Sequence, residues 1–176
     1  MRIFIAAVTT AVAIGALPGL AQAQSATGPY VDLGYANAHS SGADLGAVAG
    51  RVGYRANSWL GVEGEAAYGV KGDDVTTAGV SGRAKLRSEA AIYGVGYAPL
   101  SPNTDLFARV GYGSSRVKVS VLGASAVADG ESWNFGVGAR HHFNRGNGVR
   151  ADYTRQEFRG GSVHANVFSM AYVRRF

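Results

Sequence analysis

The chain has 176 residues, a formal net charge of +5, 26 glycines, nine tyrosines and no cysteine. The lack of cysteine excludes disulfides and a cysteine-linked lipid anchor, so an exported form of this chain relies on other interactions for stability. Its basic residues are scattered, which favours contact with anionic lipid headgroups over binding to nucleic acid.

Residues 1–23 have the parts of a secretory signal peptide. Arg2 supplies the charged start, residues 3–16 form an uncharged and mostly apolar run, and Ala21 and Ala23 give a small-x-small cleavage pattern. The apolar run is too short for a membrane-spanning helix, which needs roughly 20 residues. The sequence therefore predicts a signal peptide over residues 1–23 and one exported domain over residues 24–176.

After the signal, apolar residues alternate with small or polar residues in eight segments. A period of two predicts β-strands, because successive side chains of a strand point to opposite faces. The predicted strands cover residues 29–36, 45–54, 59–70, 91–97, 106–113, 133–143, 149–156 and 164–176. No segment outside the signal has a helical pattern.

The two faces of these strands differ in bulk. One face carries Val, Leu, Tyr, Trp and Phe, and the other carries mainly Gly, Ala and a few charges. In the fourth strand we assign Tyr93, Val95 and Tyr97 to the bulky face. An eight-stranded barrel has an interior just wide enough for side chains, and its outer face meets lipid. We therefore predict an all-β, eight-stranded antiparallel up-and-down transmembrane β-barrel with a filled interior.

The connections between the strands alternate in length, as is typical of transmembrane barrels. Short turns follow the second, fourth and sixth predicted strands, and longer loops are expected at residues 37–44, 71–84 and 114–131. Inside the last of these, residues 116–122 still alternate, which indicates that strands continue beyond the main sheet. Aromatic residues at strand ends predict two interfacial girdles. The girdle residues are Tyr54, Trp59, Tyr97 and Phe143 near the short turns, and Tyr68, Tyr112, Trp133 and Tyr153 near the longer loops.

The small-residue face also carries charged residues that we expect inside the barrel. They are Asp32, Glu63, Glu65 and Asp152, with Arg51, Arg109, Arg140 and Arg150. Buried charges need partners, and arginine suits bidentate contact with carboxylates. We interpret Glu63 and Glu65 as salt-bridge partners rather than an acid/base pair, because residues i and i+2 on one strand face are common barrel filling.

The segment AIYGVGYAPLSPNTDLFARVGYG at residues 91–113, the eight alternating strands and the final Phe176 resemble the small outer-membrane β-barrel family of the OmpA/OmpX type. The resemblance implies a location in the cell outer membrane, contact with its lipids and lipopolysaccharide, and insertion guided by the last strand. The barrel assembly machinery recognises such a strand. The outward residues of this predicted assembly signal are Phe168, Met170, Tyr172 and Phe176. Arg174 stands where the family commonly has an aromatic residue, and its long side chain is expected to reach the headgroups.

The family has no single activity, so three functions stay open. The first is a structural or surface-display barrel without an open pore, and the second is an adhesin that acts through its extracellular loops. The third is a lipid A-modifying enzyme, for which the candidates are His39 with Ser40 or Ser41, and His164 with Ser162. Isolated histidines and serines in polar loops have no triad geometry, so we expect no enzyme activity.

Further expectations concern ligands and oligomeric state. His141 and His142 are adjacent on a strand and point to opposite faces, so they cannot chelate a metal together. We expect no metal, no cofactor, no nucleic-acid partner and a monomeric barrel. A general diffusion porin is disfavoured, because an aqueous lumen needs about 16 strands.

Overall fold

The computed structural model describes residues 27–40, 43–77, 80–121, 124–160 and 163–176. The expected signal peptide lies outside these residues. The strands are β1 (Gly28–Ser40), β2 (Ala43–Arg55), β3 (Leu60–Lys71), β4 (Asp73–Thr77), β5 (Val80–Ser101), β6 (Thr104–Val121), β7 (Ala124–His142), β8 (Asn147–Phe158) and β9 (His164–Arg175). β4 follows β3 after Gly72, and both pair with β5, so β3 and β4 share one position in the sheet.

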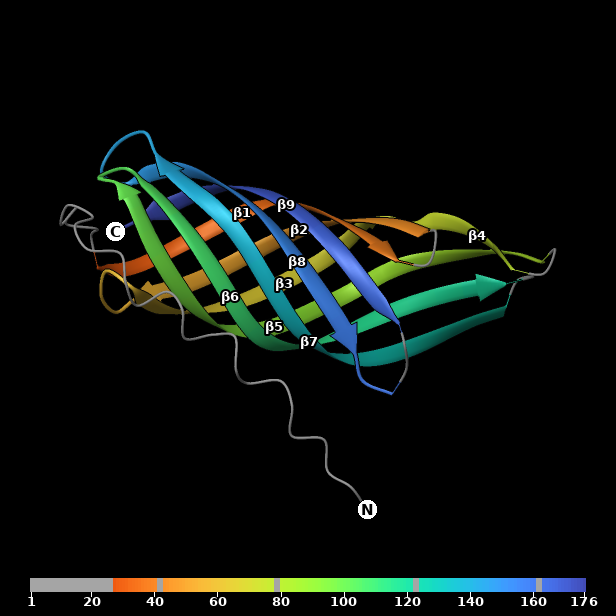
Figure 1. The fold of residues 1–176 in the computed structure, drawn as a ribbon. Coiled ribbons are helices and arrows are strands. Elements are labelled where there is room, and N and C mark those ends of the chain that lie inside the picture. The colour runs from red at the N-terminus through yellow and green to blue at the C-terminus, as the bar shows by residue number, and fades with distance from the viewer. Residues whose placement is uncertain (1–26, 41–42, 78–79, 122–123, 161–162) are drawn as a thin grey trace, which may run out of the picture.

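The sheet closes on itself. Neighbouring strands pair antiparallel along the chain, and β1 pairs with β9 from Tyr30 opposite Arg175 to His39 opposite Asn166. Figure 1 shows the strands winding obliquely around a common axis. Closure gives the backbone groups of the barrel section partners within the sheet, which a hydrocarbon environment requires. The predicted eight-stranded antiparallel barrel is confirmed. In the described part of the chain, no helix is long and apolar enough to cross a membrane.

Short turns gather at one end of the barrel, where the C-terminus also lies (Figure 1). In the β2–β3 turn, the side-chain oxygen of Asn57 accepts hydrogen bonds from the backbone amides of Trp59 and Leu60, at 2.8 and 2.9 Å. Asn144 makes the same kind of contact with two following amides in the β7–β8 turn. These side chains replace missing backbone partners, which explains why asparagine favours these turns.

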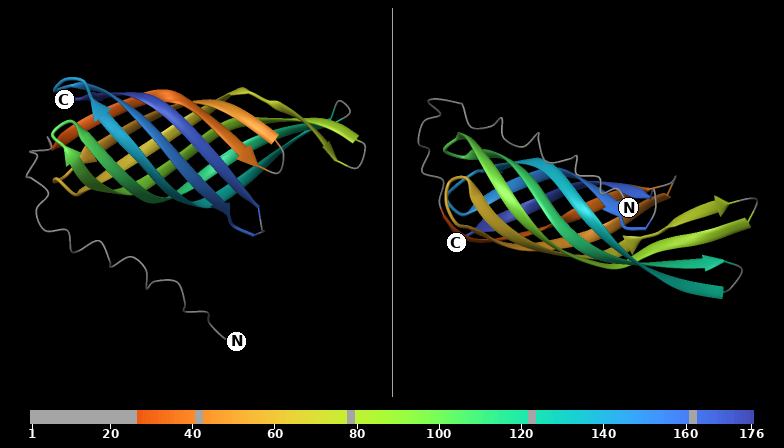
Figure 2. Two further views of the ribbon diagram at one scale, coloured as in Figure 1. Left: turned by 45° about the horizontal axis from the view of Figure 1, so that its top comes forward. Right: turned by 60° about the horizontal axis from the view of Figure 1, so that its bottom comes forward.

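The opposite end of the barrel differs from the predicted long loops. The prediction of long loops at residues 37–44, 71–84 and 114–131 is wrong, because all three segments are largely strand. β6 and β7 stay paired until Val121 lies opposite Ala124, and β4 pairs with the first part of β5. The predicted continuation of the strands is confirmed as far as residue 121. We call the part of β4–β7 beyond the barrel the projecting sheet, and Figure 2 shows it extending past the other strands.

The orientation of β5 is the reverse of the sequence prediction. Tyr93 and Tyr97 are only 2% and 4% exposed, whereas Ile92 is 68% exposed. Directly paired residues of a sheet point to the same face, and Tyr93 pairs with the buried Glu63. The tyrosines of β5 therefore lie inside the barrel, and Tyr97 does not belong to a girdle.

The remaining aromatic residues of the predicted girdles point outward. They are Tyr54, Trp59 and Phe143 near the short turns, with Tyr68, Tyr112, Trp133 and Tyr153 toward the other end. Tyr112 packs edge-to-face on Trp133, with ring centroids 5.3 Å apart. Amphipathic rings at both ends of an apolar surface are typical of a protein that spans a bilayer.

Glycine has two different uses in the barrel wall. A Cβ atom on Gly111 would lie 2.2 Å from the backbone oxygen of Ile92 and 2.5 Å from Cδ1 of Tyr93. Gly111 thus leaves space for a buried ring. By contrast, a Cβ atom on the outward-facing Gly94 would come no closer than 4.0 Å to a neighbour outside its own segment.

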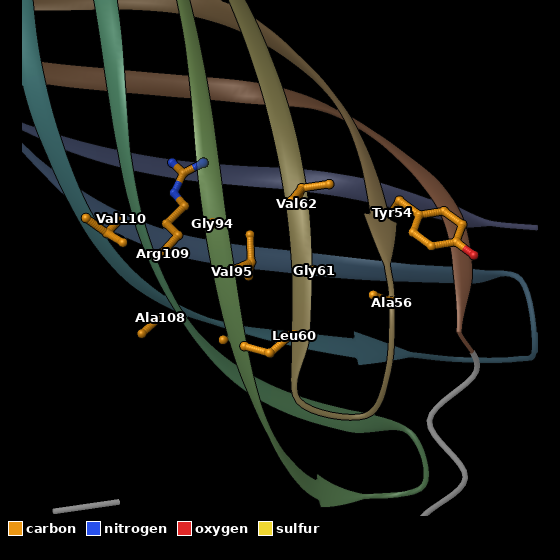
Figure 3. Close-up of a pocket in the computed structure, with 11 residues that line it drawn as sticks. Tyr54, Ala56, Leu60, Gly61, Val62, Gly94, Val95, Ala108, Arg109 and Val110 are labelled. Carbon is orange, nitrogen blue, oxygen red and sulfur yellow. The ribbon is translucent and has the colours of Figure 1, made fainter. Parts of the chain in front are cut away.

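The outward glycines of β5 leave an apolar hollow on the outside of the barrel. Gly94, Gly96 and Ala108 line it, and its volume is about 620 Å³. Figure 3 shows Leu60 and Val62 from β3 beside the same hollow. The hollow follows from the orientation of β5, because the strand directs its bulky side chains into the barrel instead of outward.

The orientation of β5 can be tested with two alanine substitutions. Gly111→Ala is expected to lower the free energy of unfolding by about 1–3 kcal/mol, because the new methyl group overpacks the interior. Gly94→Ala, the matched control on the outer face, should change it by less than about 0.5 kcal/mol. Urea unfolding in lipid vesicles measures both. If Gly94→Ala is the damaging substitution, β5 faces the other way.

Candidate functional site: a charged network inside the barrel

All eight predicted interior charges point into the barrel, and none is more than 9% exposed. We call them the interior network. Its members are Asp32 from β1, Arg51 from β2, Glu63 and Glu65 from β3, Arg109 from β6, Arg140 from β7, and Arg150 and Asp152 from β8. Alternation along the strands brings these residues to one side of the wall, and the narrow barrel brings them within contact distance.

Arg109 connects three strands across the lumen. Its Nη1 atom donates to Glu63 Oε1 and Glu65 Oε2, both at 2.9 Å. Its Nη2 atom donates to Asp152 Oδ2 at 3.1 Å and to Thr154 Oγ1 at 2.8 Å. One guanidinium group therefore links β3, β6 and β8 through charge-assisted hydrogen bonds.

Arg150 makes a second set of links. Its Nη1 atom donates to Asp32 Oδ2 at 2.8 Å, and its Nε atom donates to Asp152 Oδ1 at 2.7 Å. It also forms a bidentate contact with the carboxylate of Glu63. Arg109 and Arg150 thus share Glu63, which places this carboxylate at the centre of the network.

The other two arginines extend the network toward β9 and β1. Arg51 donates to Glu65 and, through Nη2, to Ser169 Oγ at 2.9 Å. Arg140 Nη2 lies 3.7 Å from Asp32 Oδ2. Glu63 and Glu65 are each held by two arginines, an arrangement that neutralises charge and leaves neither carboxylate poised as a general base.

Aromatic rings inside the barrel complete the packing of the arginines. The guanidinium carbon of Arg109 lies 4.2 Å from the ring centroid of Tyr93, and that of Arg150 lies 4.3 Å from the centroid of Phe107. Planar guanidinium groups stack well on rings. The interior position of Tyr93 was not predicted, because the bulky residues of its strand were assigned to the lipid-facing side.

A further buried ion pair lies near the short turns. Arg55 contacts both carboxylate oxygens of Asp105, at 2.7 and 3.1 Å, and its guanidinium stacks on Tyr97 at 4.2 Å. It also donates to the carbonyl oxygens of Asn57 and Ser58 in the adjacent turn. The predicted strands ended one residue before Arg55 and began one after Asp105. Arg55 lies four residues after the inward-facing Arg51 and therefore shares its face of the strand, which was the signal available in the sequence.

The histidine and serine candidates have separate partners. His39 Nδ1 lies 2.9 Å from Asp44 Oδ1, while Ser40 Oγ donates to the carbonyl oxygen of His164 at 2.8 Å. Ser41 and Ser162 lie outside the described residues. His141 is exposed and His142 is buried, so they point to opposite faces as predicted. Within the described ranges, no cluster of three or more His, Cys, Asp or Glu side chains has metal-site geometry.

The outer face of β9 and the end of the chain match their predicted exposure. Phe168, Met170, Tyr172 and Phe176 all point away from the barrel interior. Arg174 is exposed too, and its Nη1 atom donates to Asn147 Oδ1 at 2.6 Å, beside a short turn. This position suits the predicted contact with headgroups. The role of the four apolar residues as an assembly signal stays a prediction.

A closed sheet, an apolar outer surface with two aromatic belts and a charged interior together define a transmembrane β-barrel. Residues 5–176 match the family model described as the outer membrane protein beta-barrel domain, and the chain belongs to this family. It is an integral β-barrel protein of the cell outer membrane, where it lies in a bilayer that contains lipopolysaccharide.

Solved structures show the same fold. Ail of Yersinia pestis, in complex with the heparin analogue sucrose octasulfate, has a TM-score of 0.63 and 17% identity, with 85% of this chain and 99% of that one covered. OprG of Pseudomonas aeruginosa has a TM-score of 0.64 and 10% identity, covering 88% and 98%. Neisserial surface protein A has a TM-score of 0.56 and 13% identity, covering 85% and 97%. No curated protein matches the chain.

The interior network predicts an unequal effect of two arginine substitutions on β8. Arg150→Met is expected to lower the free energy of unfolding by about 3–5 kcal/mol, because it leaves Asp32 and Glu63 with fewer partners in a buried site. Arg155→Met removes the outward pair with Glu157 and should cost less than about 1 kcal/mol. Urea titration of the heat-modifiable gel band compares them. Equal losses would contradict a special contribution of the network.

Proposed function

We propose that this protein is a non-enzymatic outer-membrane barrel that contributes to the membrane and displays the projecting sheet, and that it has no open pore. The interior network carries this proposal. Its side chains come from six strands and contact one another across the lumen. The pair of Arg55 and Asp105 adds a second layer near the short turns.

The contacts of the catalytic candidates support a role without chemistry. A hydrolytic nucleophile needs a base within hydrogen-bond reach. The Ser40 hydroxyl donates to a backbone carbonyl, and the His39 ring is engaged by Asp44. These partners hold the two groups in separate contacts at the barrel end.

The closed lumen can be tested by electrical recording. Purified barrel reconstituted in a planar bilayer is expected to give no stepwise conductance, because charged side chains fill the lumen and leave no continuous water column. A porin with an aqueous lumen, measured at the same protein amount, serves as the positive control. Stepwise currents that scale with the amount of this protein would contradict the proposal.

An adhesin is the second candidate, and the projecting sheet favours it. Lys85 and Lys118 are exposed and directly opposite each other on β5 and β6. Like charges in this arrangement destabilise a sheet unless an anion lies between them. Both lysines line an outward hollow of about 400 Å³, together with Val70 and Gly72. The heparin analogue bound by Ail suggests sulfated polysaccharide as a suitable probe.

The adhesin candidate predicts retention on heparin resin. The folded barrel should bind at low salt. The double variant K85Q/K118Q should elute at a lower salt concentration, because two lysines no longer attract the sulfate groups of heparin. The control R155Q removes an outward arginine elsewhere on the barrel and should elute close to the unmodified protein. Unchanged elution of the lysine variant would rule out this pair as the binding site.

Two further expectations remain predictions. They are insertion by the barrel assembly machinery through the outward face of β9, and a monomeric barrel in the membrane.

A further inference from the structure

A cavity of about 430 Å³ opens at the end of the barrel opposite the short turns. We call it the mouth cavity. Its lining comes from β1, β2 and β5 to β9, and from the segment before β9, so it is surrounded by most of the barrel wall. Its lining includes Leu86, Glu89, Val117, Gln156, Phe158 and Ala165. This volume lies within the range of roughly 300–1,000 Å³ found for small-molecule sites.

The wall of the mouth cavity is mostly apolar, and its charge has one sign. Leu86, Val117 and Phe158 supply large apolar groups. The described lining contains two carboxylates, from Glu89 and Asp129, and no lysine, arginine or histidine. Asp129 is already paired with Arg116 at 3.0 Å. The negative charge available to a ligand is therefore that of Glu89.

Glu89 differs from the interior carboxylates below it. Asp32, Glu63, Glu65, Asp105 and Asp152 each have an arginine within 4 Å. Among the contacts of the described residues, Glu89 has only a hydrogen bond donated by the side chain of Gln156. A neutral amide donor compensates the charge of a carboxylate less than an arginine in direct contact does, which leaves Glu89 open to a cationic partner.

We propose that the mouth cavity binds a small amphipathic cation of the alkylammonium class. Its ammonium group donates to Glu89, and its apolar chain lies against Leu86, Val117 and Phe158. Charge complementarity selects the cation, and the apolar wall selects a ligand with a hydrocarbon part. The interior network lies beyond Glu89 toward the short turns, so the cavity is a binding site that ends inside the barrel.

This inference is independent of the adhesin candidate, because Lys85 and Lys118 line the outer surface and Glu89 lines the interior. The conductance test concerns the lumen at the interior network, whereas this inference concerns the mouth cavity above that network. Failure of either of those experiments would leave the mouth cavity and its charge unchanged.

The test is a ligand titration of the full barrel in lipid nanodiscs, followed by NMR. The probes are octylammonium, octanol and octanoate, which share one chain length. Octylammonium should produce saturable shifts at Glu89, Gln156 and Ala165. Glu89→Gln should weaken its binding by about tenfold or more and leave octanol binding within about twofold, because only the charge-assisted contact is lost.

Two variants separate cavity binding from partition into lipid. Ala165→Phe places a ring in the cavity and should abolish the saturable shifts of octylammonium, whereas Glu157→Gln, on the outer face of β8, should leave them unchanged. A mobility shift on unheated gels shows that each variant is folded. Non-saturable shifts in the unmodified barrel, octanoate binding as tight as octylammonium binding, or full binding by folded Ala165→Phe would each overturn the proposal.

Discussion

The constraint on which the structure depends is that a bilayer offers its spanning segments no water. Every backbone amide and carbonyl in the spanning part needs a partner in the protein, and pairing of β1 with β9 gives the sheet no free edge there. Closure with eight strand positions then fixes a narrow lumen, which side chains can fill. Beyond the membrane water satisfies free edges, so β4 to β7 can leave the barrel and continue as the projecting sheet.

Filling the lumen with charges requires both pairing and space. Arg109 and Arg150 share Glu63 and reach carboxylates on opposite walls, so both arginines have partners on more than one strand. Space comes from small residues: Gly111 leaves room for the ring of Tyr93, on which Arg109 stacks. The outer hollow beside Gly94 results from the same packing, because β5 directs its tyrosines into the barrel and leaves glycines on this part of its outer face.

Alternation predicted the barrel and the eight interior charges, because a period of two assigns a side to each residue once one side is known. It did not predict the orientation of β5, since Tyr93 and Tyr97 have enough bulk for lipid and enough polarity for an Arg-rich lumen. The pairing of Tyr93 with Glu63 distinguishes the inward from the outward orientation, and that register is a tertiary property. The projecting sheet was read as loops because its composition is polar. The pair of Arg55 and Asp105 was missed because strand ends are poorly defined by pattern alone.

The interior network also has a consequence for how the barrel enters the membrane. Its charges are spread over β1, β2, β3, β6, β7 and β8. A strand such as β2, β6 or β7 that entered hydrocarbon alone would carry an arginine without its partners, at a cost of about 2–4 kcal/mol at the midplane. Inserting the strands one at a time would therefore raise the free energy at several steps. We therefore expect insertion and closure to be coupled, with the chain crossing the bilayer as a nearly assembled array of hairpins rather than in the order of its sequence.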